Sequence, residues 1–176
     1  MDLSQIVINV ASSLAGPAWR LLWAISALVG TMYMGSVMMR AHRASQMSGQ
    51  TMPLGQLLML FLIAGLLVNM AKLLNVASNT LGLGEVSYGP IAYAPVAALG
   101  PLGETINACL TLASVAGGYF AFKGILLLKR ATADGNTGQS GEDIIWRSLT
   151  HLFFGALLVN ISKFIDAARV TVGSMY

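Results

Sequence analysis

The chain has 176 residues, of which 56% are hydrophobic and only 10% are charged, whereas charged residues make up about 25% of a typical soluble protein. Ten basic and seven acidic side chains are too few to coat the surface that a soluble domain of this length exposes, roughly 30% of its chain surface. This excludes a water-soluble monomer, and we expect the chain to lie in lipid or in an assembly that replaces lipid. The net charge of +3, without a basic run, does not suggest nucleic-acid recognition.

Residues 1–16 predict an amphipathic helix that lies on a membrane surface, with a plain surface helix as the alternative. One side of this helix carries an apolar stripe, and the opposite side carries polar residues. The stripe consists of Leu3, Ile6, Val7, Val10 and Leu14.

Four apolar segments follow and predict an all-α fold of integral-membrane-type helices. They cover residues 21–39, 53–71, 106–128 and 149–161. The first is close to the ~20 residues that cross about 30 Å of hydrocarbon. The last is short, so we expect protein around it. Polar connectors are predicted at 46–51 and 131–143, and the three prolines near residues 79–100 exclude one continuous helix there.

The sequence LLVNMAK, which begins at Leu66, returns 91 positions later as LLVNISK, which begins at Leu157. Small residues and a basic turn also recur at an offset of 87, and Gly16-Pro17 is echoed by Gly100-Pro101 at an offset of 84. The chain is therefore predicted to contain two copies of one unit. Each copy crosses the membrane twice, so these are tandem parallel-repeat helical hairpins. The expected units are the N-terminal helix 1–16, a first hairpin 17–78, a connector 79–100 and a second hairpin 101–172.

Small residues spaced four apart predict a helix-packing face in each hairpin, because they let two backbones approach closely. The alternative is that small residues are common in any membrane helix. The candidate packing residues are Ser26, Gly30 and Gly35 in the first hairpin and Ala113, Gly117 and Gly118 in the second.

Asn69 and Lys72, like Asn160 and Lys163, are three positions apart and are expected on one face of a helix near the end of its span. Each lysine either meets the last carbonyls of its helix and reaches the membrane surface, or binds lipid phosphate between subunits together with Lys123.

Basic residues are expected to place both turns between helices in the cytoplasm, with the termini and the central connector across the membrane. The first turn carries Arg40, His42 and Arg43, and the second carries Lys129 and Arg130. No metal-binding or enzymatic motif accompanies the two histidines, so we expect neither an enzyme nor a metal site. His151 is expected to hydrogen-bond a neighbouring helix, with a buried ligand or a proton relay as the alternatives.

The repeated unit resembles the two-helix pilins of conjugative type IV secretion systems, the TrbC-like class. The likeness rests on a Gly-Pro start, a helix with spaced glycines, a basic turn and a second helix containing Ala-Gly-Leu-Leu-Val or Gly-Ala-Leu-Leu-Val. The whole chain also resembles the small TraQ-type membrane proteins of I-type conjugation, relatives of the IcmC/DotE component of type IVB secretion. Duplication and the absence of a long leader depart from the pilin class.

The resemblance implies a homo-oligomeric structural subunit that moves from the bacterial inner membrane into an extracellular pilus. Phospholipid would be its only bound small molecule, and the basic turns would face a lumen through which DNA or protein passes without sequence-specific binding. Other secretion-system components would be its partners. Two alternatives stay open: a stationary inner-membrane component of the transfer channel, and a small transporter or channel.

Overall fold

The computed structural model describes residues 3–46, 53–133 and 139–173. Every regular element in these ranges is a helix. They are α1 (Leu3–Gln46), α2 (Leu54–Val68), α3 (Met70–Thr80), α4 (Val96–Leu99), α5 (Pro101–Ala133), α6 (Gln139–Val159) and α7 (Ile161–Gly173). The polar connector expected at 46–51 lies almost wholly outside the described residues. The one expected at 131–143 is wrong at both ends, because α5 continues to Ala133 and α6 begins at Gln139; its middle, 134–138, lies outside the described residues.

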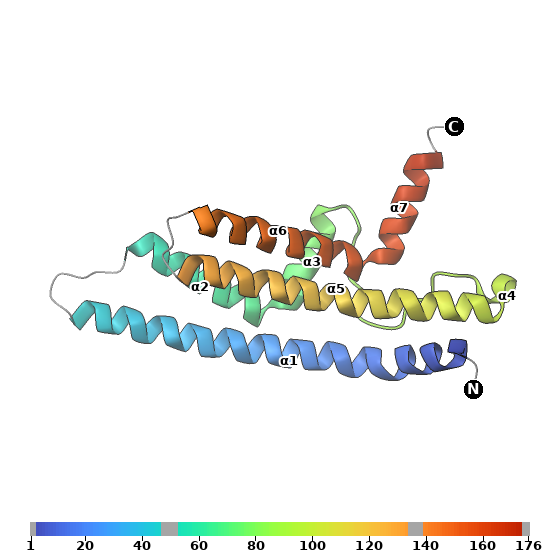
Figure 1. Cartoon of the computed structure of the whole chain (residues 1–176), viewed down its shortest axis with the longest axis horizontal. Helices are drawn as coiled ribbons and strands as arrows, with labels where there is room; N and C mark the ends of the chain where they lie inside the picture. Colours follow the sequence, from blue (N-terminus) through green and yellow to red (C-terminus); the bar gives the residue numbers. More distant parts are fainter. Residues whose placement is uncertain (1–2, 47–52, 134–138, 174–176) are drawn as a thin grey trace.

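The two long helices α1 and α5 run side by side in the same direction, and α2 and α6 run back along them (Figure 1). The N-terminus and α4 lie at one end of the molecule, and α1 and α5 finish toward the other end (Figure 1). Residues 81–95 form an irregular connector between the two halves. At its far side, Gly100 takes a φ of 56° and Pro101 begins α5, a combination that starts a helix efficiently.

Both α1 and α5 are long and apolar enough to cross a membrane, and each bent pair, α2–α3 and α6–α7, counts as one more span if its two parts are taken together. At a rise of 1.5 Å per residue, the 44 residues of α1 extend over about 66 Å. This is more than twice the hydrocarbon thickness of about 30 Å. A bilayer core crossed upright by α1 would therefore cover less than half of its length.

The helices expected to end at Lys72 and Lys163 break three residues earlier. Asn69 separates α2 from α3 at a bend of 92°, and Asn160 separates α6 from α7 at a bend of 86°. Asn69 has φ −110° and ψ 39°, outside the helical region, and asparagine competes with helix formation through its own side chain. The expectation that each Asn and Lys lie on one helical face is wrong, because each asparagine lies in the break and each lysine lies in the helix that follows it.

The boundary expected between residues 16 and 17 is also not a helix end, because α1 continues through Pro17. Proline removes one hydrogen bond to the preceding turn. Ser13 and Pro17 are both exposed, so the freed carbonyl of Ser13 lies at the surface. The apolar stripe of the first 16 residues faces outward, whereas Ala11 and Ala15 are buried against the rest of the chain.

Glycines set the distance between the paired helices. A Cβ atom on Gly30 would lie 2.8 Å from the backbone nitrogen of Val68, and one on Gly117 would lie 2.6 Å from the Cβ of Leu158. Both contacts fall in the last turn before the break of the partner helix. The core is then filled from α1, α2, α3 and α5; its fully buried members include Leu60, Ile63, Leu67 and Ile125.

We expect Gly117→Ala to destabilise the protein by about 1–3 kcal/mol, because the new methyl group overlaps Leu158. Alanine elsewhere in a helix is favoured over glycine by about 1 kcal/mol. Gly65→Ala is the matched control, since no atom lies within 4 Å of its added Cβ, and it should stabilise the chain slightly. Denaturation in detergent micelles measures both variants; an unchanged midpoint for Gly117→Ala would contradict the packing described here.

Candidate functional site

The bend between α6 and α7 is tied to the first half of the chain by a buried polar cluster. Asn160 is 3% exposed, and its Nδ2 donates a hydrogen bond to the hydroxyl of Ser78 on α3. Ser78 in turn donates to the carbonyl of Gly84, at 2.5 Å. One asparagine therefore joins the second hairpin, α3 and the connector.

Lys163 also binds the connector. Its Nζ donates to the carbonyl oxygen of Glu85. The position expected for it, beside the last carbonyls of its own helix, is wrong because Lys163 lies in the first turn of α7. Lys72 lies in the first turn of α3 and Lys123 on α5, and both side chains are exposed. The three lysines come from three separate helices.

Tyr88 fixes the middle of the connector. Its hydroxyl donates to the carbonyl of Ala71 at 3.1 Å, and its ring packs edge-on against Trp19 and Trp23, with centroids 5.0 and 4.6 Å away. Burial raises the pKa of Tyr88 to about 12, so the phenol stays a hydrogen-bond donor at neutral pH. Just before it, the amide of Val86 donates to Oδ1 of Asn75 at 2.9 Å.

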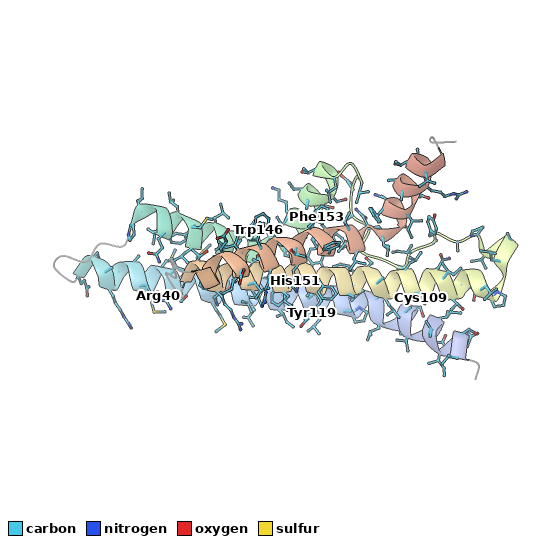
Figure 2. All side chains as sticks on the ribbon, turned by 45° about the horizontal axis from the view of Figure 1, so that its top comes forward. Arg40, Cys109, Tyr119, Trp146, His151 and Phe153 are labelled. Atoms are coloured by element: carbon cyan, nitrogen blue, oxygen red, sulfur yellow. The ribbon has the colours of Figure 1, made fainter. Side chains whose placement is uncertain are left out.

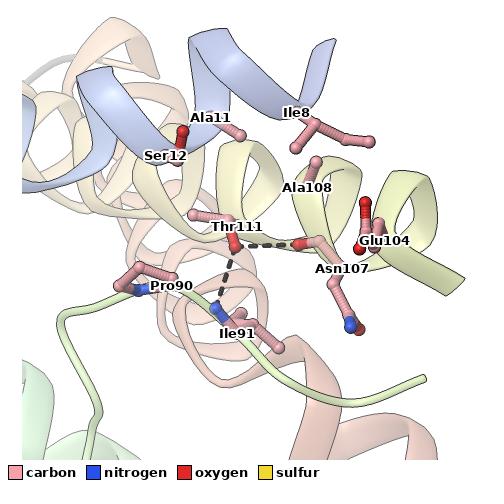
Figure 3. Close-up of a pocket in the computed structure, with 9 residues that line it drawn as sticks. All are labelled: Ile8, Ala11, Ser12, Pro90, Ile91, Glu104, Asn107, Ala108 and Thr111. Atoms are coloured by element: carbon pink, nitrogen blue, oxygen red, sulfur yellow. Dashed lines mark hydrogen bonds between the residues drawn. The ribbon is translucent and has the colours of Figure 1, made fainter. Parts of the chain in front are cut away.

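The last part of the connector is held by α5. Asn107 accepts from the amides of Tyr93 and Ala94 at 2.9 and 2.7 Å and donates back to the carbonyl of Ala94 at 3.2 Å. Thr111 accepts from the amide of Ile91 at 2.9 Å. These side chains border a small pocket of about 170 Å³ between α1, the connector and α5, shown in Figure 3. The polar side chains in this region therefore mainly hold the connector backbone in place through hydrogen bonds.

The predicted basic turns are the final turns of the long helices. Arg40, His42 and Arg43 lie near the end of α1, and Lys129 and Arg130 lie near the end of α5. Figure 2 shows Arg40 far from Cys109, which lies toward the opposite end of the molecule. Lys129 places its ammonium 4.4 Å from the centroid of the Tyr33 ring, a cation–π contact.

The predicted packing residues have different surroundings. Ser26 is buried and donates to the carbonyl of Leu67 at 2.6 Å. Gly117 lies against α6, and Gly118 lies against Trp19 and Leu22 of α1. A Cβ atom on Gly35 would meet no atom within 4 Å, and Ala113 is only half-buried.

Ser114 and Ser148 are also fully buried. Ser114 donates to the carbonyl of Val159 at 2.9 Å, and Ser148 donates to the carbonyl of Gly124 at 2.6 Å. A sequence pattern that could have identified these two serines is a serine on an apolar helix, close to a glycine of the same helix or opposite a glycine of the neighbouring helix.

His151 borders an open groove of about 340 Å³ between α5 and α6. The groove is lined by Phe120, Thr150, His151, Phe154 and Leu158. Nδ1 of His151 lies 2.7 Å from the carbonyl oxygen of Arg147, so this nitrogen carries the proton and donates. The expected hydrogen bond to a neighbouring helix is therefore wrong, because His151 bonds to a carbonyl of its own helix.

Among the residues that the structure describes, no three histidine, cysteine, aspartate or glutamate side chains gather in a way that would hold a metal ion. No protein-family model, curated protein or solved structure matches the chain.

We expect Asn160→Ala to destabilise the protein by about 1–3 kcal/mol, because it removes a buried hydrogen-bond partner of Ser78. Asn69→Ala, at the equivalent but exposed position, should change stability by less than about 0.5 kcal/mol. Limited proteolysis gives a second readout, since residues 81–95 should be cleaved faster only in the Asn160 variant. Equal effects of the two substitutions would contradict the role assigned to Asn160.

Proposed function

We propose that this chain is a structural subunit of a conjugative type IV secretion apparatus, a duplicated pilin-like protein. It polymerises into a helical tube with bound phospholipid. The proposal begins from the resemblance of its repeated unit to two-helix pilins, and it concerns a bacterial inner-membrane protein that is later built into a pilus.

The observation that carries the proposal is the matching geometry of the two halves. Gly30 packs against Leu67 and Val68, and 87 positions later Gly117 packs against Leu158 and Val159, which are 91 positions after their counterparts. The returning helix breaks directly after both contacts. This supports two copies of one hairpin fused in a single chain, as the sequence repeat predicts.

The ends of α1 and α5 supply the proposed lining of the tube. Both carry basic residues, and both finish toward the same end of the molecule (Figure 1). Arg40, Arg43, Lys129 and Arg130 would present positive charge to the phosphates of passing DNA, which attracts nucleic acid without reading its sequence. Such a surface also tolerates proteins as cargo.

Lys72 and Lys123 are the stronger candidates for holding phospholipid. Both are exposed on helices with apolar surroundings, so their ammonium groups are available to a lipid phosphate. Lys163 already donates to Glu85, and we assign it to connector binding with phosphate contact as a secondary role.

A stationary inner-membrane component of the same apparatus is the second candidate, favoured by two helices long and apolar enough to cross a membrane. A transporter is the third, because the breaks at Asn69 and Asn160 interrupt helices that would otherwise span. Transporters use such breaks to expose backbone groups to a substrate. Here Ser26 and Ser114 occupy carbonyls beside the breaks, which favours a structural role.

The first two candidates are separated by shearing conjugating cells and measuring this chain in the extracellular filament fraction. We expect enrichment there well above that of an integral inner-membrane protein followed as a control. Complete retention with the inner membrane would reject the pilin-like function and leave the stationary component as the better explanation.

A further inference from the structure

One face of the first hairpin is buried by α5, while the matching face of the second hairpin is open. In the first hairpin this face consists of Tyr33, Leu60, Ile63 and Leu67, each at most 6% exposed. Offsets of 87 on the long helix and 91 on the returning helix give the counterparts Phe120, His151, Phe154 and Leu158. These four residues line the open groove between α5 and α6.

The side of α5 that covers the first hairpin is well defined. Lys129 lies over Tyr33, Gly118 lies against Trp19 and Leu22, and Ile125 joins the same buried core. Residues on this side recur every three or four positions. They are Ala108, Thr111, Val115, Gly118, Phe122 and Ile125, and all are buried or half-buried.

The counterparts of this covering side on α1 are exposed. Subtracting the offset of 87 from the α5 positions leads to Leu21, Ala24, Leu28, Thr31, Gly35 and Met38, of which all but the half-buried Gly35 are exposed. The chain therefore contains one such contact, between α5 and the first hairpin. It also exposes the two surfaces that could form a second, equivalent contact. The helices α6 and α1 lie on opposite sides of α5 (Figure 1).

We propose that the groove between α5 and α6 binds α1 of a second copy of this chain, in the way that α5 binds the first hairpin within one chain. This inference rests on the duplicated hairpin proposed above. The contact is head-to-tail, because different surfaces of the two copies meet, and such contacts build rings or open filaments.

Lipid is a less suitable occupant of the groove. Thr150 and His151 bring a hydroxyl and an imidazole to a lining that is otherwise aromatic and aliphatic. Polar groups inside a membrane face protein in preference to lipid. In the equivalent contact, Lys129 lies over an aromatic ring. Its counterpart is His42, which the second copy would place near Phe120.

The contact within the chain also specifies a stagger. Lys129 and Gly118 lie 96 and 99 positions after their contacts Tyr33 and Trp19, whereas equivalent positions in the hairpins are 87 apart. The excess of about ten residues equals about 15 Å along the helix. Two hairpins per chain then advance each copy by about 30 Å, which matches the whole hydrocarbon thickness. Repetition of the contact therefore builds a filament that grows along the helix direction. Successive copies then no longer lie within one flat bilayer.

Cys109, the one cysteine of the chain, makes the contact testable. Within one chain, Leu22 lies against Gly118. Cys109 is the counterpart of Leu22 and Thr31 is the counterpart of Gly118, so the proposed contact places Thr31 of one copy against Cys109 of the other. We expect Thr31→Cys to form a disulfide with Cys109 of the next copy under mild oxidation, giving a reducible ladder of dimers, trimers and longer products. Within one chain these positions are roughly 28 Å apart along the helices, too far for a disulfide.

Met32→Cys is the matched control. Met32 is the neighbouring residue on α1 and is exposed, and its counterpart Tyr119 is exposed as well (Figure 2). It should give no ladder, and neither should Thr31→Cys combined with Cys109→Ala. Mass spectrometry identifies the 31–109 peptide. Absence of that peptide, or equal crosslinking of Met32→Cys, overturns the proposed interface.

The crosslinking experiment tests the interface and the shearing experiment tests the pilin-like function, so either proposal can be rejected while the other is retained. Sheared filaments without a 31–109 disulfide would retain the pilin-like function and reject this interface. A 31–109 ladder confined to the inner membrane would retain the interface and reject the pilus.

Two adjacent phenylalanines give a second test without cysteine chemistry. Phe154 and Phe153 are 55% and 50% exposed, but their counterparts are the fully buried Ile63 and the exposed Leu62. Phe154→Ala should lower the assembled fraction about tenfold, because it removes a large apolar contact from the interface. Phe153→Ala should leave it unchanged. Similar losses from the two substitutions, measured by sedimentation of intact assemblies, would argue against the groove.

Discussion

The close approach of two helix backbones at a glycine is the contact on which the rest of this structure depends. Gly117 allows α6 to lie against α5 so closely that a single methyl group would overlap Leu158. In a lipid environment, helices gain little from hydrophobic burial and associate through close packing and hydrogen bonds. The serine hydroxyls near these glycines complete the contact, because Ser26 and Ser114 each bind a carbonyl beside a helix break.

The breaks have a further consequence for the connector. By turning α3 and α7 away from the spans, they bring Ser78, Asn160 and Lys163 to one place, where these residues bind connector backbone. A connector rich in glycine and proline has few hydrogen bonds of its own, and unpaired backbone groups are costly when buried. Side chains from both hairpins supply the missing partners and thereby fix the hairpins relative to each other.

In the proposed assembly of duplicated hairpins, a contact within one chain serves as the template for the contact between copies. The contact between α5 and the first hairpin is seen directly, and its stagger of about 15 Å follows from helical rise. When two similar hairpins meet through two different surfaces, one copy of each surface takes part in the contact and the other copy stays exposed. The exposed groove beside His151 and the exposed side of α1 near Thr31 are those two surfaces.

The sequence by itself determined the all-helical, membrane-type character of the chain, because composition and the length of apolar segments depend only on local residues. It also located Gly30, Gly117 and Gly118, which pack closely, and the basic ends of α1 and α5. It was wrong for Gly35, whose added Cβ would meet no atom within 4 Å, and it missed Gly124 and Gly155. It did not reveal that α1 passes through Pro17 or that the returning helices break at Asn69 and Asn160. These features depend on which backbone carbonyls accept a hydrogen bond from a hydroxyl far away in the sequence and which carbonyls lie at the surface. Only the tertiary structure decided that two equivalent asparagines differ, with Asn160 buried on Ser78 and Asn69 exposed, since burial is set by the neighbouring hairpin and not by the repeated heptapeptide.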